Sequence, residues 1–301
     1  MRRGVVLFIT LAILLMLSGI IMLFLKEGGE IKASVRENMA VIQTNLLLND
    51  MSGFLKKQEF SQEDIFYGSE IPVSLDLGRI NGTISMTSAQ NRININRFLK
   101  SVMSEQQALI SLLDWLDTLK LKNQPLLISI LLDSYDKDRY ERMDGSEIVL
   151  KRPWFQNGTI ANERALRTIL NHYAELSGDM NISIERWTSV FGFEGDTIDL
   201  NYAGKDQLRL LYPDLPQIAL DTLASHTSIY KSVDDIPIDP ESRMKLLAPR
   251  FGIRPTLKSG DIDVSIEFET TQECSGRMAF RMELQKRKRI DSIRISQIRC
   301  P

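Results

Sequence analysis

Five acidic side chains lie close together near the middle of the 301-residue chain, at Asp133, Asp136, Asp138, Glu141 and Asp144. Carboxylate oxygens are the ligands that calcium prefers, so Asp133, Asp136, Asp138 and Glu141 form a candidate calcium site. Their spacing is not that of an EF-hand loop. A solvated acidic turn is therefore the favoured interpretation, and calcium binding is the alternative.

The only two cysteines, Cys274 and Cys300, both lie close to the C-terminus. Two thiols in an exported region can pair, because the compartment outside the cytoplasm is oxidising. We expect a disulfide between Cys274 and Cys300, and two free buried thiols are the alternative.

Two histidines are present, His172 and His226, and neither has metal-ligand spacing or a nucleophile motif beside it. The sequence also has no glycine pattern of the kind that cradles phosphate. We therefore predict that the protein is not an enzyme. His172 adjoins the apolar stripe of a predicted helix, which indicates a partly buried structural residue.

The N-terminal end has the features of a membrane anchor. Residues 5–25 form an uncharged apolar run, which as a helix at about 1.5 Å per residue can cross a hydrocarbon core of about 30 Å. Arg2 and Arg3 precede this run, and basic residues remain on the cytoplasmic side of a span. We expect a retained anchor with the body exported. A cleaved secretory signal is the alternative, although its apolar core usually has only about 15 residues.

A nucleic-acid partner is not expected, because the formal net charge is −2. Residues 207–224 have the pattern of a helix-hairpin-helix, which binds phosphates through closely approaching backbone N–H groups. Here the turn contains Pro213, Asp214 and Pro216, so it lacks donors and repels phosphate. We interpret the hairpin as a packing module.

Several stretches alternate apolar and polar residues with a period of two, the pattern of half-buried strands. They cover residues 79–86, 261–269, 280–284 and 290–298. A lone strand or a two-stranded ribbon is only marginally stable. We therefore expect the early strand to pair with the C-terminal strands.

The remaining pattern is helical, which predicts an α+β fold. Residues 26–95 are expected to extend the anchor helix and form the first strands. Residues 96–250 are expected to form an inserted helical domain, and residues 251–301 to return to the sheet. One helix has an apolar stripe before Gly178, consisting of Leu166, Ile169, Leu170 and Tyr173.

At these motifs the chain resembles the minor pseudopilin K family of the type II secretion system, also called general secretion pathway protein K. The leader and the apolar start (RRG-VVLFI, 2–9) resemble a prepilin peptidase site. The other similar segments are NRININ (91–96) with LLDWLD (112–117), and IDLNYA (198–203) with LRLL (208–211) and VDDI (233–236).

The resemblance implies a pilin-like fold in which a long N-terminal helix packs on a small antiparallel sheet that a large helical domain interrupts. It implies a leader of residues 1–4, cut by prepilin peptidase between Gly4 and Val5. The fifth residue after this cut is Ile9 and not the glutamate of ordinary pilins, which favours a place at the pseudopilus tip. Calcium is bound by some family members.

The implied partners are the I- and J-type minor pseudopilins, with a single span in the bacterial inner membrane and a periplasmic body. The expected role is to initiate the pseudopilus and to export proteins across the outer membrane. A minor pilin of a type IV pilus or competence system is the nearest alternative, and a plain single-span anchored periplasmic protein is another.

Overall fold

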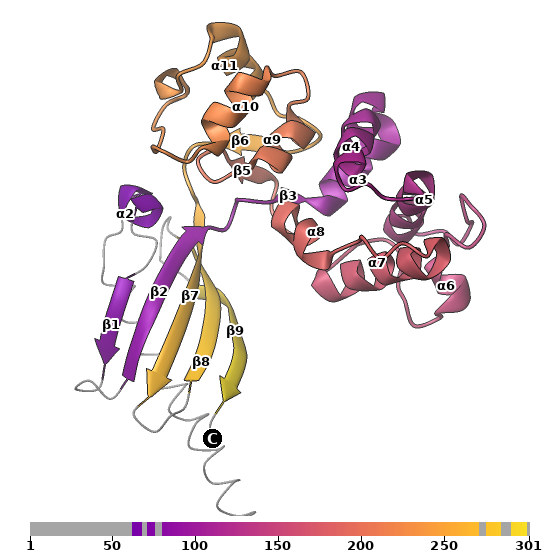
Figure 1. The fold of residues 1–301 in the computed structure, drawn as a ribbon, viewed down its shortest axis with the longest axis horizontal. Coiled ribbons are helices and arrows are strands. Elements are labelled where there is room, and N and C mark those ends of the chain that lie inside the picture. Colours follow the sequence, from indigo (N-terminus) through magenta and orange to yellow (C-terminus); the bar gives the residue numbers. More distant parts are fainter. Residues whose placement is uncertain (1–61, 68–70, 76–79, 271–274, 284–289, 300–301) are drawn as a thin grey trace, which may run out of the picture.

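The computed structural model, drawn in Figure 1, describes residues 62–67, 71–75, 80–270, 275–283 and 290–299. The predicted cleavage site at Gly4 and Val5, the apolar run 5–25 and the two cysteines, Cys274 and Cys300, lie outside these residues. Within the described residues, no helix is both long enough and apolar enough to span a membrane.

A five-stranded antiparallel sheet has the strand order β1-β2-β7-β8-β9. β2 pairs with β7 along its whole length, with Ile84 opposite Ile266. The expected pairing of the early strand with the C-terminal strands is therefore confirmed. The strands are β1 (Ile71–Leu75), β2 (Ile80–Ser88), β7 (Asp261–Thr270), β8 (Ser275–Glu283) and β9 (Ile290–Arg299).

The two faces of this sheet differ as the period of two predicts. Ile84 and Met86 of β2 are buried on one face together with Ile262, Val264 and Ile266 of β7. The alternating positions carry hydroxyl and charged side chains, which are partly exposed. Successive side chains of a strand point to opposite faces, so one face is apolar and the other polar.

All the helices between Ile95 and Leu247 lie between β2 and β7 in the chain. Figure 1 shows them in two groups, with α9–α11 above the sheet and α3–α8 beside it. They are α3 (Ile95–Ser104), α4 (Gln106–Thr118), α5 (Gln124–Tyr135), α6 (Ile148–Lys151), α7 (Glu163–Ser177), α8 (Ile184–Val190), α9 (Lys205–Leu211), α10 (Gln217–Ala224) and α11 (Pro240–Leu247). The shorter elements are α2 (Gln62–Tyr67), the 3₁₀ helix η2 (Val233–Asp235), and two parallel pairs, β3 (Ile93–Asn94) with β4 (Phe191–Gly192) and β5 (Thr197–Asp199) with β6 (Arg254–Thr256).

Helix α7 forms as its sequence predicts. Its apolar stripe is buried, and Gly178 ends it in the left-handed region at φ 63°, where glycine carries no Cβ penalty. The stripe consists of Leu166, Ile169, Leu170 and Tyr173.

The centre of the helical part is aromatic. Trp115 of α4 packs edge-on against Trp187 of α8, with ring centroids 4.9 Å apart. Phe191 of β4 stacks on Trp187 at 5.5 Å and also contacts Phe98 of α3 at 5.8 Å. These rings join three helices and one short strand in one buried cluster.

Candidate functional site

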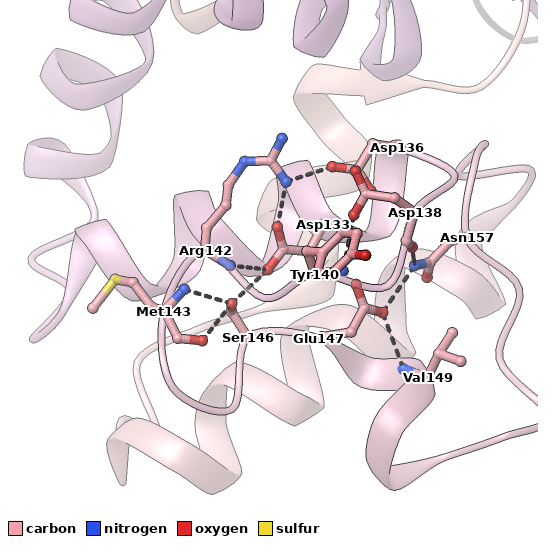
Figure 2. Close-up of polar contacts among 10 residues, drawn as sticks. All are labelled: Asp133, Asp136, Asp138, Tyr140, Arg142, Met143, Ser146, Glu147, Val149 and Asn157. Carbon is pink, nitrogen blue, oxygen red and sulfur yellow. Dashed lines mark hydrogen bonds and ion pairs between the residues drawn. The ribbon is translucent and has the colours of Figure 1, made fainter.

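The predicted acidic turn is organised by an arginine (Figure 2). The Arg142 guanidinium forms ion pairs with both Asp133 and Asp136, and the Arg142 main-chain N–H donates to Asp133 Oδ2 at 3.1 Å. The Ser146 hydroxyl also donates to Asp133, which is completely buried. The cation that these two carboxylates hold is therefore a side chain of the protein itself.

The other predicted ligands are used within the turn. Asp138 Oδ1 accepts from the Tyr140 main-chain N–H at 2.9 Å, and Glu141 Oε2 accepts from the Gly145 N–H at 2.9 Å. Asp144 is exposed. In the described part of the chain, no three His, Cys, Asp or Glu side chains are grouped so as to hold a metal ion. Calcium binding by the four predicted residues stays a prediction.

Two residues that the sequence did not single out lie beside this turn, Glu147 and Asn157. The Asn157 amide donates to Glu147 Oε1 at 2.8 Å, and the same oxygen caps α6 by accepting from the Val149 N–H at 3.3 Å. Glu147 Oε2, Asn157 Oδ1 and Asp136 Oδ1 are buried and accept no hydrogen bond from the described residues. Burial raises the pKa of Glu147, and the charges of Asp133 and Asp136 add to that effect.

These three oxygens are the hard donors that suit a calcium ion, although calcium takes about six to eight such ligands. Main-chain carbonyls and water would have to supply the others. Glu147 has no distinctive spacing from the acidic residues before it. Its place before the apolar Ile148 indicates only a helix cap. Glu147 does cap α6, and it also accepts the hydrogen bond from Asn157.

The side chains of the asparagine-containing segment 91–96 bind main-chain groups both nearby and far along the chain. Asn94 caps α3, because its Oδ1 accepts from the N–H groups of Asn96 at 3.0 Å and Arg97 at 3.3 Å. The Asn96 amide then binds both main-chain groups of Ile160, its Oδ1 accepting at 2.8 Å and its Nδ2 donating at 3.0 Å. Asn94 therefore caps the helix that follows it, as asparagine often does, while Asn96 binds main chain 64 residues away.

The second segment repeats this geometry. Asp199 Oδ1 accepts from the Asn201 N–H at 3.0 Å, as Asn94 does from Asn96. The Asn201 amide binds both main-chain groups of Tyr230, accepting at 2.8 Å and donating at 3.1 Å, and it also donates to the Leu257 carbonyl at 3.1 Å. The N-cap of the following helix, α9, is Gly204, so neither Asp199 nor Asn201 caps that helix. The side chains of this segment join distant main chain instead.

Asp199 also connects the helical part to the sheet. The hydroxyl of Ser259, just before β7, donates to Asp199 Oδ2, and Ser88 at the end of β2 contributes a further hydrogen bond. Burial raises the pKa of Asp199, although the hydrogen bonds from Ser259, the Asn201 main chain and Ser88 act in the other direction. The Ala89 N–H donates to the Asp261 carbonyl at 3.0 Å, so the two chain crossings between sheet and helices are adjacent.

A cleft of about 450 Å³ lies between the polar face of the sheet and the helical part. Arg281 of β8 binds Asp263 of β7 through Nε at 2.8 Å, and its Nη1 binds Glu194 of the helical part at 2.9 Å. Arg92 reaches Asp263 at 3.8 Å and the Thr188 carbonyl at 3.4 Å. Charged side chains thus span the cleft from one wall to the other.

The remaining candidates are structural. His172 is buried, and its Nε2 lies 2.8 Å from the Gly145 carbonyl oxygen, so it supports the acidic turn. Helices α9 and α10 form the predicted hairpin, and Leu215 is buried in the turn between them. The Tyr212 hydroxyl at the start of this turn donates to the Leu246 carbonyl at 3.1 Å. The turn of the hairpin is therefore buried against the protein through Tyr212 and Leu215.

The fold is similar to that of a solved structure, although the sequence itself matches little. No protein-family model matches the sequence, and no curated protein matches it. The structure is similar to a chain in the crystal structure of the GspK–GspI–GspJ complex from the type 2 secretion system of enterotoxigenic Escherichia coli. The TM-score is 0.55 at 13% sequence identity, and the match covers 88% of this chain and 99% of that chain. The chain therefore shares its mixed helical and small-sheet fold with a component of that complex.

Proposed function

We propose that this protein is a minor pseudopilin of the type II secretion system, of the K type. The observation that carries the proposal is the placement of every helix from Ile95 to Leu247 between two paired strands, β2 and β7. The structural match extends over nearly the whole of a chain in the GspK–GspI–GspJ complex. The role is assembly and not catalysis.

The sequence adds the finer part of the proposal. Prepilin peptidase removes residues 1–4, residues 5–25 anchor the chain in the inner membrane, and the body lies in the periplasm. Ile9 in place of a glutamate supports a position at the pseudopilus tip, because a buried carboxylate in a bilayer is retained only where a partner neutralises it. The partners are the I- and J-type minor pseudopilins.

Processing is tested by the intact mass and N-terminal sequence of the protein purified from native membranes. We expect a chain that begins at Val5 in the wild type and at Met1 in Gly4→Val, while the control Gly28→Ala is processed normally. A wild-type chain that begins at Met1 contradicts the proposal and favours a plain anchored periplasmic protein.

The machine is tested by deleting the gene and measuring two outputs in the same strain. Loss of protein export across the outer membrane, restored by the wild-type gene, is the expected result. Loss of pili or of DNA uptake with export intact assigns the chain to a type IV pilus or competence system instead.

Calcium binding at the acidic turn is a second proposal, supported by the three buried oxygens of Asp136, Glu147 and Asn157. Calorimetric titration of the full chain with calcium is expected to give heat of binding that Glu147→Gln removes. Asp144→Asn is the matched control, because Asp144 is an exposed carboxylate of the same turn. No heat at millimolar calcium, or equal heat from wild type and Glu147→Gln, contradicts the proposal.

A further inference from the structure

The cleft between the sheet and the helical part has no role in the proposed function, and its volume of about 450 Å³ is typical of ligand-binding pockets. Its floor is the polar face of three neighbouring strands. Thr87 of β2 lies opposite Asp263 of β7, which lies opposite Arg281 of β8. The next row on this face consists of Ser85, Ser265 and Ala279. Since neighbouring strands lie about 4.8 Å apart, polar groups recur at short intervals across the floor.

The charged groups of the cleft neutralise one another. Two arginines and two acidic residues form ion pairs within it, namely Arg92, Arg281, Asp263 and Glu194. A further lining residue, Glu163, is paired with Arg167 on α7. Asp261 lines the adjoining hollow of about 320 Å³ and adds its negative charge near Arg281. A charged ligand would have to compete with an existing ion pair, whereas a neutral ligand would not.

Several lining groups nevertheless have hydrogen-bonding capacity to spare. Arg92 donates to the Thr188 carbonyl at 3.4 Å and lies 3.8 Å from Asp263, so most N–H groups of its guanidinium are unused among the described residues. The Thr87 hydroxyl has no hydrogen-bond partner in the described part of the chain. Glu194 is 79% exposed and uses only Oε2, in its ion pair with Arg281. The cleft therefore offers both donors and acceptors to a ligand.

One wall of the cleft also carries an aromatic ring. Phe193 follows β4, packs partly against the core of the helical part and lines the cleft with the rest of its surface. The face of an aromatic ring is negative and attracts the weakly positive C–H groups of a ligand. A ligand that suits this cleft has no net charge, carries hydroxyl groups and presents one flat face of C–H groups.

We propose that the cleft binds a neutral saccharide. Thr87 and Arg92 donate hydrogen bonds to its oxygens, Glu194 accepts from its hydroxyl groups, and Phe193 packs on the C–H face of a sugar ring. A glycan strand of the cell wall and a free oligosaccharide share this chemistry. The inference stands apart from the proposed function, because none of these contacts involves assembly with other subunits.

Calorimetric titration of the full chain with chitotriose and with maltotriose tests the proposal. Both are neutral, and only chitotriose carries acetamido groups like those of cell-wall glycan. The detergent is an amine oxide, because a maltoside would itself be a competing sugar. We expect heat of binding, with a dissociation constant that changes less than about twofold between about 0.1 and about 0.5 M sodium chloride, since salt screens only charged partners. Heat from chitotriose alone supports a cell-wall glycan as the ligand, and heat from both supports saccharides in general.

Two variants with matched controls locate the binding in the cleft. Thr87→Val should weaken binding about two- to tenfold, because one hydrogen bond is lost while the shape of the side chain is kept. Arg92→Gln should weaken it about tenfold or more, because hydrogen bonds from a charged donor are stronger. Thr83→Val, on the same face of β2, and Arg97→Gln, whose ion pair is similarly long at 3.9 Å, should leave the constant unchanged. Neither control residue lines the cleft or the adjoining hollow.

Three results overturn the proposal. The first is no heat from either oligosaccharide at millimolar concentration. The second is binding that weakens steeply with salt, which indicates a charged ligand. The third is an equal loss in Thr87→Val and Thr83→Val, which places the binding outside the cleft. Urea midpoints are measured for every variant, and if Arg92→Gln does not fold, the comparison of Thr87→Val with Thr83→Val decides. A negative result leaves the proposed function standing, since processing and export are measured separately.

Discussion

Replacing Asn201 with alanine tests whether the second asparagine segment joins the helical part as the structure indicates. Asn201 is 3% exposed and makes three hydrogen bonds, two with the main chain of Tyr230 and one with the carbonyl of Leu257. Each bond contributes about 1 kcal/mol net, and a buried group left unpaired costs about 1–3 kcal/mol. We therefore expect Asn201→Ala to lower the free energy of unfolding by about 3–5 kcal/mol.

The equivalent change at Asn96 provides an internal comparison. Asn96 makes two such bonds, both with Ile160, at a position that is only partly buried, so Asn96→Ala is expected to cost about 1–2 kcal/mol. Asn171→Ala is the control, since Asn171 is exposed on α7, and its expected change is within about 0.5 kcal/mol.

Urea unfolding of the full chain in detergent is followed by the fluorescence of the buried Trp115 and Trp187. The free energy in water is obtained by linear extrapolation, and equal slopes are required before the variants are compared. A loss of less than about 1 kcal/mol in Asn201→Ala, or a larger loss in Asn96→Ala than in Asn201→Ala, refutes this reasoning.

Three further outcomes follow from other buried groups. Because burial raises the pKa of Glu147, the metal-free fold loses stability as pH rises through that raised pKa, and urea midpoints measured in EDTA should show a slope that Glu147→Gln reduces. The pKa of Asp179 is lowered, since N–H groups of Asn181 and Lys122 and the Tyr173 hydroxyl outweigh the effect of burial. Its contribution is present above the ordinary carboxyl pKa and is lost as pH falls, so acid titration should unfold Asp179→Ala with a shallower pH dependence. Trp187→Ala removes the centre of the aromatic cluster and should cost about 3–5 kcal/mol in the same urea assay.

The strands and α7 could be predicted because their signals are local. Residues 261–269 alternate without interruption, and the stripe of α7 repeats with the helical period up to Gly178. The strand β1 was not predicted, since it is short and contains Pro72, a residue that is confined in sheets to edges, strand starts and bulges. Its position at the edge of the sheet is consistent with that restriction.

The candidate sites were less predictable, because their partners are distant in the sequence. Asn94 and Asp199 each accept from the N–H two residues later, which is a local signal. The partners of the next asparagine in each segment, Ile160 for Asn96 and Tyr230 for Asn201, depend on how whole helices pack, which is not a local signal. In the acidic turn, the spacing of the carboxylates did not reveal that Arg142 neutralises two of them.

The adjacent chain crossings at Ala89 and Asp261 have a consequence for the order of folding. Pairing β2 with β7 closes a loop of residues 89–260, and an unstructured loop of that length costs about 3 kcal/mol more closure entropy than a tight turn. The ends of the folded helical part lie side by side, because the Gly260 N–H donates to Gln90 Oε1 at 3.3 Å, next to the Ala89–Asp261 bond at 3.0 Å. The two strands can then pair with as little further loop closure as in a hairpin, although they are remote in the sequence.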